Sequence, residues 1–227
     1  MKLFPIFKQR QDLKPQELPW NNRPSIFGHI HSNLESSGRL AASAYDLPDE
    51  GRRYKKGAVR WAPGAMDGAF GYHGNAGDNK KVAQRIAGLI KAISNKNGLV
   101  DKVALYDVLL EDNIMDFIDP AMEKIIATKS PVHPHLHNYA RWLAFESPDR
   151  GPVKFGIALL GLIRDNSDID KIITLGKHEE FTLFSAVAIT NSLKESEQVL
   201  WELAKCVNGW GRIHLVERLA NTKKQAI

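Results

Sequence analysis

One stretch of sequence decides the fold, residues 149–161, which read Asp149-Arg150-Gly151-Pro152-Val153-Lys154-Phe155-Gly156-Ile157-Ala158-Leu159-Leu160-Gly161. A turn containing glycine and proline leads into apolar residues, of which Val153, Gly156 and Leu159 follow one another at three-residue spacing. That spacing places the three residues on one face of a helix. Proline at such an entry is typical of the first helical turn.

The same pattern recurs twice, each time 30 residues further along the chain. In the second helix of each unit the matching residues are Val153, Leu183 and Ile213, then Gly156, Ala186 and Val216, then Leu159, Ile189 and Leu219. In the first helix they are Tyr139, Ile169 and Val199, then Leu143, Ile173 and Leu203. A fixed period with one helical hairpin per unit is typical of an α-solenoid.

The pattern therefore predicts an all-α fold, an α-α superhelix. The repeats are expected at residues 134–163, 164–193 and 194–220, within a helical region that spans residues 79–227. Before the repeats, Asp119-Pro120 is expected to open a helix that buries Ile125 and Ile126.

Residues 1–78 have a different composition, with 9 of the 17 glycines and 6 of the 11 prolines of the chain. These residues interrupt regular structure, so we expect a loop-rich N-terminal extension. Its aromatic residues are more numerous than those of a typical disordered tail. We therefore expect the extension to pack on the repeats.

The motif Asp149-Arg150-Gly151-Pro152-Val153-Lys154, followed by Ala158-Leu159-Leu160-Gly161, resembles the start of the second helix of a HEAT or HEAT-like repeat. The short period is similar to the compact HEAT-like class, and the resemblance covers residues 134–220. It implies an armadillo-like helical repeat fold and names no function. The second unit departs from the first, with His178-Glu179 in place of Pro148-Asp149.

Charge raises one alternative function. The chain carries a formal net charge of +5, and its densest basic cluster lies in the N-terminal extension. The candidate binding residues there are Arg52, Arg53, Lys55, Lys56, Arg60 and Trp61. A basic run with interleaved aromatic residues can follow phosphates and stack on bases, although such runs are commonly solvated loops.

Histidines provide weak metal candidates at His133, His135, His137 and at the pair His178-Glu179. The first three could meet one metal ion only in an extended segment, because alternate residues of a helix do not share a face. The resemblance adds a second route, since some HEAT-repeat hydroxylases hold two iron atoms between His-Glu pairs. One visible pair is too few ligands for such a centre, and a helix start with favourable acidic charge is the simpler interpretation.

The segment from Arg60 to His73 combines glycines with polar and aromatic residues, as functional loops do. It has no phosphate-loop spacing and no serine-nucleophile motif. If the chain is an enzyme, Asp67 and His73 are the first candidates for general acid and base. The alternative is a loop whose aromatic residues are buried against the repeats, and no cofactor is expected.

The remaining features suggest a cytoplasmic protein with no membrane segment, because no stretch approaches about 20 apolar residues. Its single cysteine, Cys206, cannot form an internal disulfide and is expected in a helix. The leading hypothesis is a non-catalytic binding scaffold that recognises a protein or peptide. Nucleic-acid binding and a metal-dependent or acid/base enzyme, hydroxylase-like, are the alternatives.

The last unit predicts a further contact. With a 30-residue period, a fourth unit would reach its first core position near residue 229, after Ile227. Terminal repeats need a polar outer face, and Glu217 and Arg218 supply only part of one. We expect the array to continue in a longer protein, or its last pair to be covered by a second copy or a partner.

Overall fold

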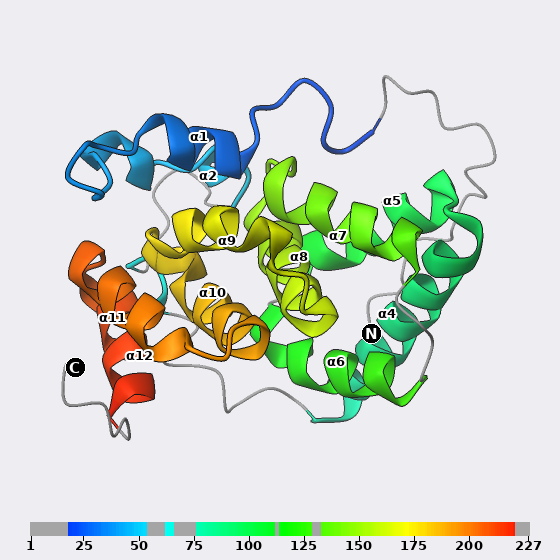
Figure 1. Ribbon diagram of the computed structural model, residues 1–227. Helices are drawn as coiled ribbons and strands as arrows, with labels where there is room; N and C mark the ends of the chain where they lie inside the picture. The colour runs from blue at the N-terminus through cyan, green and yellow to red at the C-terminus, as the bar shows by residue number, and fades with distance from the viewer. Residues whose placement is uncertain (1–17, 54–61, 66–75, 112–113, 129–132, 221–227) are drawn as a thin grey trace.

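The computed structural model describes residues 18–53, 62–65, 76–111, 114–128 and 133–220. The prediction of an all-α fold is confirmed, because every regular element in these ranges is a helix (Figure 1). Strand pairing within them is limited to one isolated bridge between Leu34 and Leu40. Among the described helices, none has the length and apolarity needed to cross a membrane.

Three helix pairs are stacked side by side in the second half of the chain (Figure 1). Their bounds are α7 Pro134–Phe145 with α8 Arg150–Ile163, α9 Ile169–Gly176 with α10 Glu179–Ser192, and α11 Ser196–Cys206 with α12 Gly209–Leu219. Each pair packs within itself, and the second helices α8, α10 and α12 also pack on one another in order. Each of the segments 134–163, 164–193 and 194–220 contains one of these helix pairs.

Glycines set the close spacing of these helices. A Cβ atom on Gly156 would lie 2.5 Å from the Ala144 backbone nitrogen, so α7 and α8 touch backbone to backbone. A Cβ atom on Gly161 would lie 2.7 Å from the Cα atom of Ala188, which joins α8 to α10 in the same way. Small residues at these crossings allow the helix axes to approach closely.

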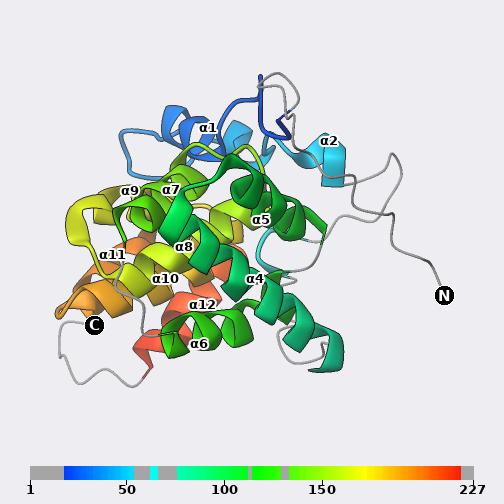
Figure 2. The same cartoon turned by 90° about the vertical axis from the view of Figure 1, so that its right-hand side faces the viewer.

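A second group of helices precedes the stack in the sequence and packs against its first pair, α7 and α8. It consists of α4 Ala76–Lys96, α5 Leu99–Glu111, the short 3₁₀ helix η3 Ile114–Asp116 and α6 Ile118–Ala127. Figure 2 shows α4 running beside both α5 and α6, and α4 also packs on α7. Asn97, with φ of 51°, provides the left-handed residue that reverses the chain between α4 and α5.

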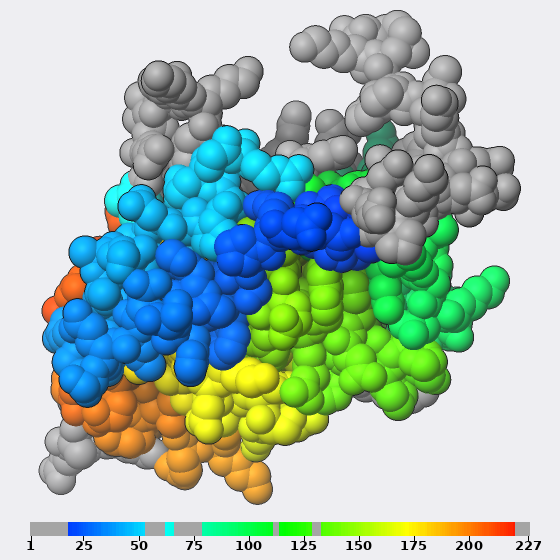
Figure 3. Space-filling view, turned by 90° about the horizontal axis from the view of Figure 1, so that it is seen from above, coloured from blue at the N-terminus to red at the C-terminus, as the bar shows by residue number. Residues whose placement is uncertain are grey.

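The described N-terminal residues lie across the stack. Helix α1, Ile26–Ser32, packs on α7 and α9, and the short helices η2 Ala42–Tyr45 and α2 Glu50–Arg53 follow it. Figure 3 shows these residues, in blue and cyan, covering one face of the repeats. Ile26, Ile30 and Leu47 are buried in the same core as the repeat residues.

Three residues expected in the core are exposed. Ile126 is 57% exposed, because α6 turns this side chain away from α4. Ile213 is 45% exposed and Val216 is 51% exposed, because α12 turns its opposite side to α10 and α11. The positions fit the helical period, but periodicity does not specify whether a neighbour is present to cover them.

Candidate functional site

Charged residues are buried where the N-terminal residues meet the turns of the helix pairs. The Arg150 side chain donates from Nε to Asp49 Oδ1 at 2.9 Å, and its backbone N–H donates to Asp49 Oδ2 at 3.0 Å. Glu50 also pairs with Arg150, and Lys154 Nζ lies 2.9 Å from Glu180 Oε1. Burial alone would lower the pKa of Arg150, but the charges of Asp49 and Glu180 outweigh it and raise this pKa.

Asp149 is the centre of a second buried group. Its Oδ2 atom accepts hydrogen bonds from Arg23 Nη1 and from the Tyr106 hydroxyl, both at 2.7 Å. Burial and the charge of Asp149 raise the pKa of Tyr106, so this phenol stays protonated. Ser147 lies within hydrogen-bond distance of the same hydroxyl, at 2.9 Å. Asp49 and Asp149 are thus each hydrogen-bonded to other groups of the chain, as buried carboxylates with a structural role are.

The pair His178-Glu179 is a helix start. His178 precedes α10, and its Nδ1 atom accepts a hydrogen bond from the Glu180 backbone N–H at 3.2 Å. Burial lowers the pKa of His178 to about 3, so its ring is neutral near pH 7. Within the described residues, no three His, Cys, Asp or Glu side chains gather as a metal ion would require.

The first histidine group is also placed at a helix start. His133 precedes α7 and accepts from the His135 backbone N–H at 3.3 Å, and the two ring centroids lie 4.6 Å apart with their planes tilted by 35°. His137 points elsewhere, with Nε2 3.5 Å from the Asp165 carboxylate. The three imidazoles are therefore not brought together.

Most of the other candidates fall outside the described residues: Lys55, Lys56, Arg60, Trp61, Asp67 and His73, together with the side chain of Arg53. Arg52 is described and exposed, and its Nη1 atom lies 3.7 Å from Asp149 Oδ2. The proposed roles of the basic cluster and of the Asp67 and His73 loop therefore stay predictions.

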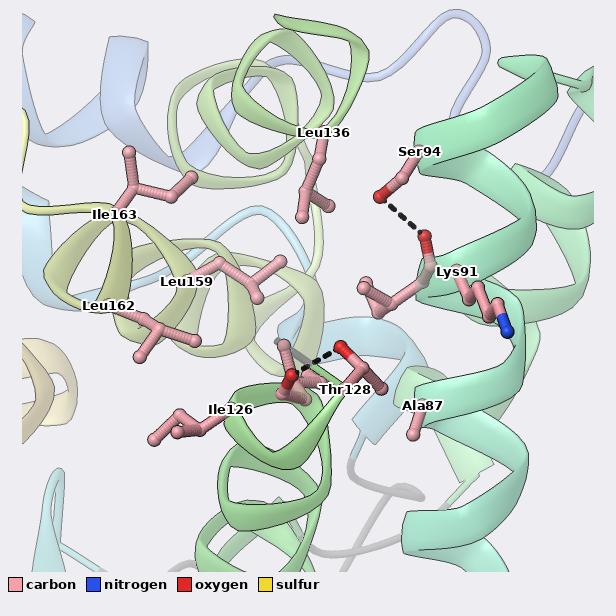
Figure 4. Close-up of a pocket in the computed structure, with 11 residues that line it drawn as sticks. Ala87, Lys91, Ser94, Ile126, Thr128, Leu136, Leu159, Leu162 and Ile163 are labelled. Atoms are coloured by element: carbon pink, nitrogen blue, oxygen red, sulfur yellow. Dashed lines mark hydrogen bonds between the residues drawn. The ribbon is translucent and has the colours of Figure 1, made fainter. Parts of the chain in front are cut away.

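The described residues also form a pocket of about 220 Å³ between four helices (Figure 4). Helix α4 supplies one wall, the end of α6 another, and α7 and α8 the third. The lining residues are Ala87, Ile90, Lys91, Ser94, Ile125, Ile126, Thr128, Leu136, Leu159, Leu162 and Ile163. Leu159 and Ile90 are buried at its inner side, whereas the exposed Ile126 stands at its rim.

The pocket exists because α6 packs along α4 but makes few contacts with α8. Where α4 faces the pocket it carries small residues such as Ala87, and these do not fill the space between α6 and α8. Ala87 and Ser94 are the two small residues among the four that α4 contributes to the lining. Because its rim residue Ile126 is 57% exposed, the pocket is open at the surface.

The polar groups in the pocket are already satisfied. The Ser94 hydroxyl donates to the Ile90 carbonyl oxygen at 2.9 Å, and the Thr128 hydroxyl donates to the Ile125 carbonyl oxygen at 2.6 Å. Figure 4 shows the Lys91 amine directed away from Leu136 and Leu159. The pocket therefore offers apolar surface and no group suited to acid or base chemistry.

The sequence signals did not reveal this pocket or the Arg150 network. Each is assembled from residues of several elements, and Asp49 is 101 residues from Arg150 in the chain. The sequence did contain one indication of the Arg150 network. Arg150 stands at the start of an apolar helix, and a charged residue that is buried there requires a partner.

Comparisons with known proteins add no relative. No family model matches the sequence, and no curated protein and no solved structure is significantly similar to it.

Proposed function

We propose that the chain is a non-catalytic, HEAT-like recognition scaffold that binds a protein or peptide. The observation that carries the proposal is the apolar pocket between α4, α6, α7 and α8. It accepts one apolar side chain of the partner, which packs against Leu159 and Ile90 under the rim residue Ile126. Partner contacts of this kind, one anchor in one pocket, supply most of the binding energy in many interfaces.

Size favours an amino-acid side chain over a cofactor or a drug-sized ligand. Sites for small molecules enclose about 300–1,000 Å³, and a cavity of about 150 Å³ already holds benzene. The pocket, at about 220 Å³, falls between these values. A leucine, phenylalanine or tryptophan side chain of a partner fits this range, whereas a cofactor does not.

Chemistry supports recognition over the alternatives. A catalytic site needs convergent titratable groups, and the only one that lines this pocket is Lys91. Binding of single-stranded nucleic acid uses aromatic platforms, and the pocket lining includes no aromatic residue. The buried carboxylates Asp49 and Asp149 are bonded to arginines of the chain and act as structural groups.

Selection of peptides from a random display library on the folded chain tests the proposal. Selected peptides are expected to share one large apolar residue, and its replacement by alanine should cost about 2 kcal/mol or more of binding free energy. Ala87→Leu, which fills the pocket, and Ile126→Asp, which charges its rim, should each abolish binding. Val100→Asp is the control, because Val100 is exposed on α5 and does not line the pocket.

Two results would contradict the proposal. Peptides whose binding survives both pocket variants must bind elsewhere. If instead the chain binds DNA or RNA at low salt and loses affinity steeply as salt rises, the nucleic-acid alternative takes its place.

A further inference from the structure

The rim of the apolar pocket carries positive charge. The lining, which consists of described residues, includes Lys91 and contains no aspartate or glutamate. Arg164 is exposed and directly follows the lining residue Ile163 at the end of α8. Lys124 precedes the lining residue Thr128 by four residues, so the two share one face of α6. Each of α4, α6 and α8 thus brings one cation to the pocket.

The chain does not neutralise these three cations. Within the described ranges, none of Lys91, Lys124 and Arg164 forms an ion pair. The buried cations Arg150 and Lys154 differ, because Asp49 pairs with the first and Glu180 with the second. A single solvated lysine carries little information, but three cations around one apolar opening form a pattern that a partner can recognise.

Two carboxylates stand close in sequence to the lining residues. Asp165 is held by its own loop, since Oδ1 accepts from the Ser167 backbone N–H at 2.9 Å and Oδ2 lies 3.5 Å from His137 Nε2. Glu123 is exposed on α6, three residues before the rim residue Ile126. The three cations at the rim therefore outnumber the one exposed carboxylate beside it.

The geometry points to an acidic peptide as the partner, with a large apolar anchor in the pocket and carboxylates on both sides of that anchor. This inference rests on the proposed function and specifies the chemistry of its partner. Figure 4 shows Ile163 and Lys91 on opposite sides of the pocket, with the Lys91 amine directed away from the apolar interior. The anchor enters between them, and the flanking carboxylates stay outside, near Lys91 on one side and Arg164 on the other.

Charge and apolar contact contribute differently to this recognition. Exposed ion pairs are individually weak and are screened by salt, so the anchor supplies most of the affinity. The cations speed the approach of an acidic peptide and oppose a basic one, because charges at a rim act mainly on the association rate. They therefore determine which of the peptides with a suitable anchor binds.

Two display libraries with the same apolar residues test the inference, one with acidic and one with basic flanking residues, both selected on the full chain at low salt. The acidic library is expected to yield binders at least about tenfold more often. Lys91→Glu should slow association of a selected acidic peptide by about tenfold and leave its dissociation rate nearly unchanged. Glu123→Lys should speed association by about threefold, a gain that misfolding cannot produce.

Lys205→Glu is the matched control, because Lys205 is 51% exposed on α11 and does not line the pocket. It should change the association rate by no more than about twofold. Peptides that lose binding to Ala87→Leu but show no acidic preference and no response to Lys91→Glu overturn this inference and leave the proposed function in place. If neither library yields a binder, the proposed function fails as well.

A DNA duplex provides the remaining comparison. Duplex binding that is lost in Lys91→Glu and unchanged in Ala87→Leu would also overturn the inference, because the cations would then serve phosphates and not a peptide anchored in the pocket.

Discussion

Asp49 holds Arg150 at two points, accepting from its guanidinium Nε atom at 2.9 Å and from its backbone N–H at 3.0 Å. Both side chains are buried, and Arg150 is the first residue of α8. One carboxylate thus neutralises a buried cation and also satisfies a backbone donor at the start of the helix. This contact joins the N-terminal residues to the first repeat.

Asp49→Ala is expected to lower the free energy of unfolding by about 3–5 kcal/mol, because it leaves a buried arginine with part of its compensation lost. Urea unfolding monitored by circular dichroism measures the change. Glu202→Ala is the control, since it removes an exposed ion pair with Lys205 and should cost less than about 1 kcal/mol. A loss at Asp49 as small as that at Glu202 would show that the network contributes little.

Two glycines within helices should respond to alanine in opposite directions. Gly156→Ala should destabilise by about 1–3 kcal/mol, because its Cβ atom meets the backbone of Leu143 and Ala144. Gly88→Ala should stabilise by about 1 kcal/mol, because α4 has open space there and alanine favours helix. Thermal unfolding of both variants distinguishes them, and a gain at Gly156 would refute the close packing of α7 on α8.

Core truncation tests the repeat register. Leu159 and Ile189 are fully buried at equivalent positions of α8 and α10. Leu159→Ala and Ile189→Ala should each cost about 2–5 kcal/mol in the free energy of unfolding. Val187→Ala, at an exposed neighbouring position, should change it by no more than about 0.5 kcal/mol. Similar small effects at all three sites would contradict the register.

Acid should destabilise the protein through His178. Burial lowers the pKa of its ring to about 3, with Arg150, His29 and Lys154 acting in the same direction and Glu180 opposing them. The unfolded chain, with a His pKa of about 6.5, then binds a proton that the folded chain does not. The stabilising contribution is complete above that pKa and is lost progressively as pH falls from about 6.5 toward 3.

The measurement compares wild type with His178→Asn, which keeps an N-cap acceptor for α10 and removes the titrating ring. Between pH 7 and pH 5.5, the wild type should lose about 1 kcal/mol more stability than the variant. Parallel loss in both proteins would assign the acid sensitivity to other groups.

The helical period, the turns with glycine and proline, and the positions of Gly156 and Ala186 were enough to predict an all-α array of helix pairs. The exposure of Ile126, Ile213 and Val216 was not predictable in the same way, because each follows the apolar period and only the arrangement of neighbouring helices leaves it uncovered. The pocket depends on the sparse packing of α6 on α8, and a local sequence pattern carries no information about it.

The Arg150 network eluded prediction for a related reason. Its partners are separated by 101 residues, and Gly64, which donates its backbone N–H to Glu180, is 116 residues away from that carboxylate. Single-sequence patterns report neighbours three or four residues apart. Pairing over such distances becomes visible only once the helices are placed in space.

The N-terminal residues bond to parts of the chain that are made much later in synthesis. Arg23 contacts Asp149, 126 residues on, and Arg39 donates to the carbonyl oxygen of Lys205, 166 residues on. Residues that leave the ribosome early must therefore wait until α8 and α11 have been synthesised before they can dock. Contacts of such long sequence separation form slowly, whereas each helix pair closes locally. We therefore expect the repeats to assemble before the segment that covers them, in the reverse of the order of synthesis.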